Sequence, residues 1–197
     1  MKILGCIIAG GNSTRMGRDK ALTLWRGQTL ISHVAERLAP QVDQLVINAN
    51  GNSERFAFLK LTVIADVITT RTPLAGLHAA LKFANTHGFD AVLSAPCDTP
   101  ILPFDLRERL QGDGAAIATS AQQAHYLTGF WPVALVQLFK HPQRRVMDFA
   151  VSAKAREVLW QFDNIDPFTN LNTPEDLETF DLAEASQHAA FKDLNEI

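Results

Sequence analysis

The sequence predicts an α/β fold: a single domain with a mostly parallel sheet and helices on both of its faces. Short apolar runs alternate along the chain with segments in which apolar residues recur at helical spacing. This alternation is typical of strand–helix–strand units. The chain has 197 residues, of which 47% are hydrophobic. A domain of this length can bury a core without metals or disulfides.

The first half of the chain reads as strands and helices in turn. Four apolar runs indicate strands at residues 3–9, 45–47, 61–65 and 91–95. Apolar residues spaced at i, i+3, i+4 and i+7 indicate helices in the regions 31–38 and 77–84. Because parallel strands need long crossover connections, these helices are expected to cover the sheet.

The segment after the fourth strand begins with a loop. Pro96 and Pro103 bound this loop, since proline fits neither a helix interior nor a central strand. A short helix is expected around Leu106 and Leu110. In the less regular second half, strands are expected at residues 115–119, 126–131 and 157–162, and helices at 133–140, 145–153 and 173 to about 182. Residues 183–197 are expected to form a polar tail.

Charge and cysteine content exclude several classes of function. The formal net charge of −3 leaves no excess of Lys and Arg for a nucleic-acid backbone, so polymeric nucleic acid is not an expected partner. No apolar run approaches the length of a membrane-spanning helix, and the first run is too short for a signal, so no membrane role is expected. Cys6 and Cys97 form no C-x-x-C pair, which fits a reducing cytoplasm.

A loop rich in glycine and cations follows the first strand. Gly10 and Gly11 let backbone N–H groups point inward with no Cβ in the way. Arg15, Arg18 and Lys20 supply charge for phosphate oxygens. The loop contains neither G-x-x-x-x-G-K-[ST] nor G-x-G-x-x-G. Its composition suits a polyphosphate, and the alternative is a surface loop with solvated charges.

In these residues the chain resembles the molybdenum cofactor guanylyltransferases, which have the Rossmann-like nucleotidyltransferase fold. The family pattern L-A-G-G-x-S-x-R-M-G-x-D-K is matched from position 8 to position 20, with Ile8 in place of Leu. Further matches follow in family order along nearly the whole chain: Asn48-Ala49-Asn50, Asp66, Pro73-Leu74-Ala75-Gly76, Cys97-Asp98-Thr99-Pro100, Arg144-Arg145-Val146 and Asn170-Leu171-Asn172-Thr173-Pro174.

Two positions depart from the family pattern. Thr72 stands where the family usually has Gly, and His125-Tyr126 stands where it often has His-Pro. Because Thr adopts a positive φ less readily than Gly, the loop at Thr72 is expected to follow a different path.

Asp98 is the expected metal ligand. It follows the strand at residues 91–95, and open α/β sheets bind ligands at the carboxyl ends of their strands. A carboxylate there can hold Mg²⁺ while waters and phosphate oxygens take the other positions of the ion. The alternative is an Asp that caps the turn at Thr99 and Pro100. The resemblance implies the metal role.

Polar side chains also follow the second and third strands. Asn48, Asn50 and Asp66 fall at these strand ends. The oxygens of a carboxylate suit guanine, since they can accept from its N1–H and N2–H, and the sugar is an alternative partner. Taken alone, such residues are more often loop caps. The resemblance implies that Asn48 and Asp66 bind the nucleotide.

The cations of the loop differ in what they can do. Arg15 offers a planar fork to phosphate oxygens, and Lys20 offers a compact charge that can stabilise a transition state. With Asp98, they are the expected catalytic residues. The resemblance implies a ligand-binding set of Ile8, Ala9, Gly10, Gly11, Arg15, Lys20, Asn48, Asp66, Gly76, Asp98, Asn170 and Asn172.

By analogy with the family, Asn170 and Asn172 belong to the acceptor side, as do Arg144 and Arg145. Taken alone, Asn170 and Asn172 are turn formers and the two arginines are a solvated face. Residues 1–110 are expected to form the nucleotide-binding half of the single domain 1–197, and residues 111–182 the acceptor-binding half.

The resemblance implies Mg²⁺-dependent transfer of GMP from GTP to the terminal phosphate of molybdenum-bound molybdopterin, which gives the guanine dinucleotide and pyrophosphate. Molybdoenzyme apoproteins or their chaperones are the further partners that it suggests. One alternative is a cytidylyltransferase or another small nucleotidyltransferase. An alternative of a different class is a carrier that binds the molybdenum cofactor and catalyses nothing.

Overall fold

The computed structural model describes residues 1–10, 19–68, 72–140, 145–171 and 176. Seven strands form one sheet in the order β5-β4-β1-β6-β8-β7-β9. β8 runs antiparallel to its neighbours β6 and β7, and the other neighbouring strands are parallel, so the prediction of a mostly parallel sheet is confirmed. The strands are β1 Ile3–Ile8, β4 Gln44–Asn48, β5 Thr62–Ile64, β6 Ala91–Pro96, β7 Ala116–Ser120, β8 Gln123–Pro132 and β9 Arg156–Trp160.

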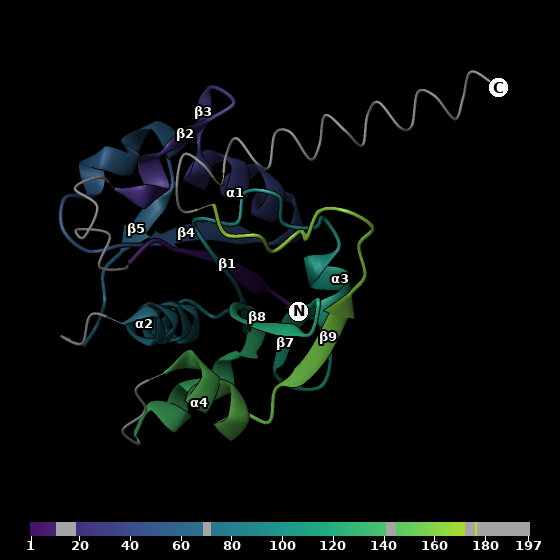
Figure 1. Ribbon diagram of the computed structural model, residues 1–197. Coiled ribbons are helices and arrows are strands. Elements are labelled where there is room, and N and C mark those ends of the chain that lie inside the picture. The colour runs from purple at the N-terminus through teal and green to yellow at the C-terminus, as the bar shows by residue number, and fades with distance from the viewer. Residues whose placement is uncertain (11–18, 69–71, 141–144, 172–175, 177–197) are drawn as a thin grey trace.

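Helices cover both faces of this sheet, as predicted (Figure 1). They are α1 Leu30–Leu38, α2 Pro73–Thr86, α3 Leu106–Leu110 and α4 Val146–Ser152. α1 and α3 pack on one face, and α2 and α4 pack on the other. Within the described ranges, no helix combines the length and the apolar character that crossing a membrane requires.

β1 lies inside the sheet, between β4 and β6, and contributes to both cores. Its side chains alternate, so that Ile3 and Ile7 join the core under α1 while Leu4 and Cys6 join the core under α2. Every residue of the strand is buried. A strand covered on both faces needs apolar residues on both, which explains why β1 reads as an unbroken apolar run.

Pro96 was expected in a loop, and this prediction is wrong, because it is the last residue of β6 and lies opposite Ile8 of β1. The next residue, Cys97, donates its N–H to the Ile8 carbonyl oxygen at 3.2 Å. The nitrogen of Pro96 therefore points toward β8, whose pairing with β6 ends at Ser94. Proline is tolerated at this strand end because its missing N–H has no partner to lose.

Several short elements are absent from the sequence prediction or differ from it. β2 (Leu24–Trp25) and β3 (Gln28–Thr29) form a hairpin whose turn residues, Arg26 and Gly27, have φ values of 50° and 79°. A 3₁₀ helix, η4 (Ser53–Leu59), connects β4 with β5. The helix expected at residues 133–140 is also a 3₁₀ helix, η5 (Val133–Lys140). Such short elements leave little periodicity in a sequence.

Thr72 adopts an ordinary extended conformation. It occupies the N-cap position of α2 with φ −129° and ψ 153°, and Pro73 is the first residue of the helix. Any residue adopts this backbone conformation. The predicted conflict with a positive φ therefore does not arise at Thr72, and residues 69–71 lie outside the described part of the chain.

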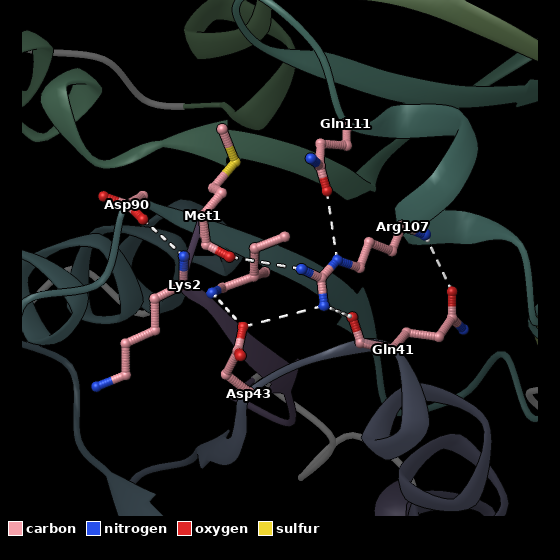
Figure 2. Close-up of polar contacts among 8 residues, drawn as sticks. Met1, Lys2, Gln41, Asp43, Asp90, Arg107 and Gln111 are labelled. Carbon is pink, nitrogen blue, oxygen red and sulfur yellow. Dashed lines mark hydrogen bonds and ion pairs between the residues drawn. The ribbon is translucent and has the colours of Figure 1, made fainter.

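A polar network fixes the start of β1, at the edge of the sheet opposite to the strand's carboxyl end (Figure 2). The Arg107 guanidinium donates to the backbone oxygen of Gln41 at 3.4 Å and to Gln111 Oε1 at 3.3 Å. It also lies 4.0 Å from Asp43 Oδ2, which accepts the Ile3 N–H at 2.7 Å. These contacts join the start of β1 to the segments around Gln41 and Arg107.

Candidate active site

The candidate site lies where β1, β4 and β6 end. Ile8, the last residue of β1, lies opposite Asn48 of β4 and Pro96 of β6. The Ala9 N–H donates to the Asn48 carbonyl oxygen at 2.8 Å. The segments that leave the three strands therefore start side by side, as in the ligand sites of open parallel sheets.

Lys20 and Asp98 form an ion pair at this edge, in which Lys20 Nζ donates to Asp98 Oδ2. The two side chains are 24% and 15% exposed, respectively. Lys20 is the first residue of a 3₁₀ helix, η2 (Lys20–Leu22), and Asp98 follows β6. Asp98 Oδ1 is buried and finds no hydrogen-bond partner among the described residues. One carboxylate oxygen thus holds the ammonium, while the other can accept a second cation.

Asp98 Oδ1 has the chemistry of a magnesium ligand. Mg²⁺ prefers oxygen and is commonly held by one or two carboxylates together with waters and substrate phosphates. The described residues contain no group of three or more His, Cys, Asp or Glu that could hold a metal. A site built on Asp98 would leave the remaining positions of the ion to water and phosphate oxygens.

Asn48, Asn50 and Asp66 lie together, as the sequence suggested. Asp66 Oδ1 accepts from Asn48 Nδ2 at 3.0 Å, and Asp66 Oδ2 accepts from Asn50 Nδ2 at 2.7 Å. The Asp66 N–H donates to Asn50 Oδ1 at 3.0 Å. The two amides fix the orientation of the carboxylate, and each carboxylate oxygen keeps a lone pair for a ligand.

Gly76 lies so close to Asn48 that any larger residue would force the Asn48 side chain to move. A Cβ at Gly76 would clash with Asn48 Oδ1, and a Cβ at Gly10 would lie 3.1 Å from the same atom. Asn48 Oδ1 is buried and has no hydrogen-bond donor among the described residues. The first turn of α2 and the start of the glycine loop therefore converge on one buried amide oxygen.

The acceptor-side residues are only partly described. The Leu171 N–H donates to the Asp98 carbonyl oxygen at 2.9 Å, so the preceding residue, the exposed Asn170, lies close to the backbone of Asp98. Arg145 is exposed at the N-cap of α4. The other predicted residues, Gly11, Arg15, Arg144 and Asn172, lie outside the described part of the chain.

Asp19 and Arg55 are further candidate site residues, and the sequence assigned no role to either. Asp19 Oδ1 accepts the Ala21 N–H at 3.2 Å and so caps η2, the helix that carries Lys20. Asp19 Oδ2 lies 2.9 Å from Arg55 Nε in η4. The D-K end of the family pattern was a signal for Asp19. Arg55 gave none, because its role depends on where η4 folds.

The two cysteines are buried, free thiols. Burial raises the pKa of Cys97, and the neighbouring charge of Asp98 raises it further. Burial also raises the pKa of Cys6 to about 12. Both thiols are therefore protonated at neutral pH, and neither has the character of a nucleophile.

Comparisons with known proteins find one family and several similar relatives. The MobA-like NTP transferase domain family matches residues 5–159. The molybdenum cofactor guanylyltransferase of Cereibacter sphaeroides is 43% identical over 185 residues, which cover 90% of this chain and 94% of the relative. The molybdenum cofactor guanylyltransferase of a Bradyrhizobium species is 39% identical over 204 residues, with coverage of 96% and 94%.

Solved structures share the fold. Molybdopterin-guanine dinucleotide biosynthesis protein A from Archaeoglobus fulgidus has a TM-score of 0.68 at 20% identity and covers 96% of this chain and 100% of its own. A nucleotidyl transferase from Methanothermobacter has a TM-score of 0.72 at 16% identity, with coverage of 94% and 99%. At these identities the likeness shows the fold alone.

Proposed function

The chain belongs to the molybdenum cofactor guanylyltransferases, a group of MobA-like NTP transferases, and from this premise we propose how its own residues carry out the transfer. GMP passes from GTP to the terminal phosphate of molybdenum-bound molybdopterin, and pyrophosphate leaves. The observation that carries the proposal is the Lys20–Asp98 ion pair at the sheet edge, with Asp98 Oδ1 still unpartnered among the described residues.

The chemistry needs positioning more than proton transfer. An oxygen of the acceptor phosphate attacks the α-phosphorus of GTP, and the bond from that phosphorus to pyrophosphate breaks. The acceptor oxygen is already ionised, so no general base is required. In-line placement and neutralisation of charge supply the acceleration.

Lys20 neutralises charge on the leaving pyrophosphate in this proposal. Its ammonium is held at the edge by Asp98 Oδ2, so little reorganisation is needed when charge develops nearby. Arg15 would bind the phosphates beside it. Asp98 Oδ1 would hold Mg²⁺, which when bound draws phosphate oxygens together and offsets their charge.

The nucleotide and the acceptor would bind at this edge on different halves of the domain, the nucleotide on residues 1–110 and the acceptor on residues 111–182. We assign the base and sugar of GTP to Asn48 and Asp66, with Gly76 leaving room for the Asn48 amide. GTP would also contact residues 8–11, where the glycine-rich loop begins. Asn170, beside Asp98, and Asn172 would bind the acceptor.

Two further parts of the proposal concern the setting of the enzyme. We propose that it works in the cytoplasm, because Cys6 and Cys97 are free thiols in the fold. Its product would pass to molybdoenzyme apoproteins or their chaperones. A cross-linking experiment with such an apoprotein in the presence of GTP would test the second part.

Thermal unfolding with Mg²⁺ and each of GTP, CTP, UTP and ATP tests the proposed site. A ligand at a hundred times its Kd adds about 2.7 kcal/mol, which raises Tm by several degrees. We expect this shift for GTP in the wild type and its loss in Asp98→Asn. Asp113→Asn removes an exposed carboxylate of the same type and should keep the shift.

Pyrophosphate release separates the enzyme from its alternatives. With GTP, Mg²⁺ and molybdenum-bound molybdopterin, we expect release from the wild type and none from Asp98→Asn. A stabilising effect of CTP instead of GTP would point to a cytidylyltransferase. Binding of the pterin without pyrophosphate release under any nucleotide would point to a carrier.

A further inference from the structure

We propose that Ser120 and Asp166 are positioning residues for the acceptor, because they anchor the segment 166–171 that carries Asn170. The inference rests on the proposed function, in which Asn170 binds the acceptor. It assigns to the carboxyl end of β7 and to Asp166, after β9, a role that no motif in the sequence indicated.

Two hydrogen bonds link the side chains of His125, Ser120 and Asp166 in a row. Ser120 Oγ donates to Asp166 Oδ2 at 2.6 Å. His125 Nε2 lies 2.6 Å from the same Ser120 oxygen. Since the only hydroxyl hydrogen of Ser120 goes to Asp166, Ser120 accepts the Nε2–H of His125. Ser120 is fully buried, so its polar contacts are strong and costly to lose.

Asp166 in turn organises the segment that follows it. Its Oδ1 accepts the Phe168 N–H at 2.9 Å. Its backbone oxygen accepts the Thr169 N–H at 3.1 Å and the Thr169 hydroxyl at 2.8 Å. Phe168 is buried and stacks on His125, with 4.7 Å between the ring centroids. The turn from residue 166 to residue 169 is thus fixed by one carboxylate oxygen and by the backbone oxygen of Asp166.

The far end of the segment is anchored at the catalytic edge. The Leu171 N–H donates to the Asp98 carbonyl oxygen at 2.9 Å. The Leu171 side chain packs with Trp25 of β2 and Leu30 of α1, which follow η2 and its Lys20 in the sequence. Asn170 therefore lies between two anchors, one at Asp166 and one at Asp98.

The direction of the strands places the first anchor on the acceptor side. β7 and β6 both run antiparallel to β8, so β7 ends at the same edge of the sheet as β6. Ser120, at the end of β7, is separated from β6 by β8. Asn48, assigned to the nucleotide, lies on β4, on the other side of β1. Loosening the Ser120 anchor should therefore affect the acceptor and spare GTP.

Steady-state kinetics of Ser120→Ala and Asp166→Asn test the inference. Asp166→Asn keeps an oxygen for the Phe168 N–H but replaces the oxygen that accepts from Ser120. We expect KM for the acceptor to rise roughly tenfold in both variants, in keeping with the loss of one hydrogen bond to a charged group. KM for GTP and the GTP-dependent rise in Tm should stay at wild-type values. Asp163→Asn, an exposed residue three positions earlier, is the control.

Hydrogen exchange gives a readout that does not depend on activity. In Ser120→Ala, the Leu171 amide should exchange faster while amides of β1 keep their protection. Wild-type acceptor KM in both variants, or unchanged exchange at Leu171, would overturn the inference. An equal loss of GTP binding would overturn it as well, because the segment would then support the whole site. Failure of the wild type to release pyrophosphate would instead refute the proposed function.

Discussion

The two oxygens of Asp98 meet different surroundings, and this difference shapes the site at the scale of single residues. Oδ2 accepts from Lys20, while Oδ1 is buried without a partner among the described residues. A buried carboxylate oxygen is costly to leave unpaired. The arrangement is therefore poised to gain free energy when a cation binds.

Removing the ammonium tests the role assigned to Lys20. Lys20→Ala should lower kcat by about a hundredfold to a thousandfold, because one preorganised charge is lost from the transition state. The Kd for GTP should change much less, since the remaining contacts bind the ground state. Lys82→Ala, at an exposed position on α2, is the control. An equal loss in kcat and in GTP affinity would make Lys20 a binding residue only.

Gly76 offers a second test at this scale. In Gly76→Ala the new methyl group would meet Asn48 Oδ1, and such overpacking costs about 1–3 kcal/mol. The shifted Asn48 would also release Asp66, so GTP affinity should fall. Urea unfolding measures the first effect and thermal shift the second.

A double-mutant cycle identifies the cause of that loss. In an Asn48→Ala background the methyl group meets no amide, so Gly76→Ala should cost less than in the wild type. If the cost is the same in both backgrounds, the conflict does not lie with Asn48.

Connections between elements depend on buried polar side chains, and Gln41 is the clearest case. Its Nε2 donates to the backbone oxygens of Arg37 (2.8 Å) and Pro103 (3.0 Å). Its Oε1 accepts the Arg107 N–H at 3.0 Å. One amide thus joins the end of α1 to the start of α3, at the edge opposite to the candidate active site.

Replacing this amide should affect stability and not catalysis. Gln41→Met keeps the length of the side chain but leaves the Arg107 N–H and the Pro103 oxygen without their partner. We expect a loss of about 2 kcal/mol in urea unfolding. Gln111→Met, whose exposed side chain accepts only from the Arg107 side chain among the described contacts, should cost far less. A large fall in kcat at full stability would contradict this assignment.

At the scale of the whole molecule, two half-buried histidines make stability depend on pH. Burial lowers the pKa of His125, although Asp166 opposes the shift. Burial also lowers the pKa of His78, and Lys82 adds to the effect. Below the ordinary value of 6.5, the unfolded chain therefore takes up protons that the folded chain resists.

The free energy of unfolding should consequently fall as the pH drops below about 6.5 and level off once the folded protein is also protonated. Urea unfolding from pH 5 to pH 8 measures the slope. His125→Gln and His78→Gln should each flatten it. A slope equal to that of the wild type in both variants would contradict the role of these histidines.

The sequence by itself determined the α/β class, the positions of most strands and helices, and which polar residues lie where strands end. Burial of one face or of both produces a regular spacing of apolar residues in the sequence. Parallel strands also end at a common edge of the sheet. Asp66 could be placed beside Asn48 for that reason. Lys20 and Asp98 were indicated by the family pattern.

Only the tertiary structure decided how these residues meet. The Lys20–Asp98 pair joins positions 78 residues apart, and the Ser120–Asp166 bond joins positions 46 residues apart. The antiparallel direction of β8 and the place of Arg55 beside Asp19 are of the same kind. Such contacts depend on how distant segments pack against each other. A local pattern reports only whether a residue is buried, and not which partner it finds there.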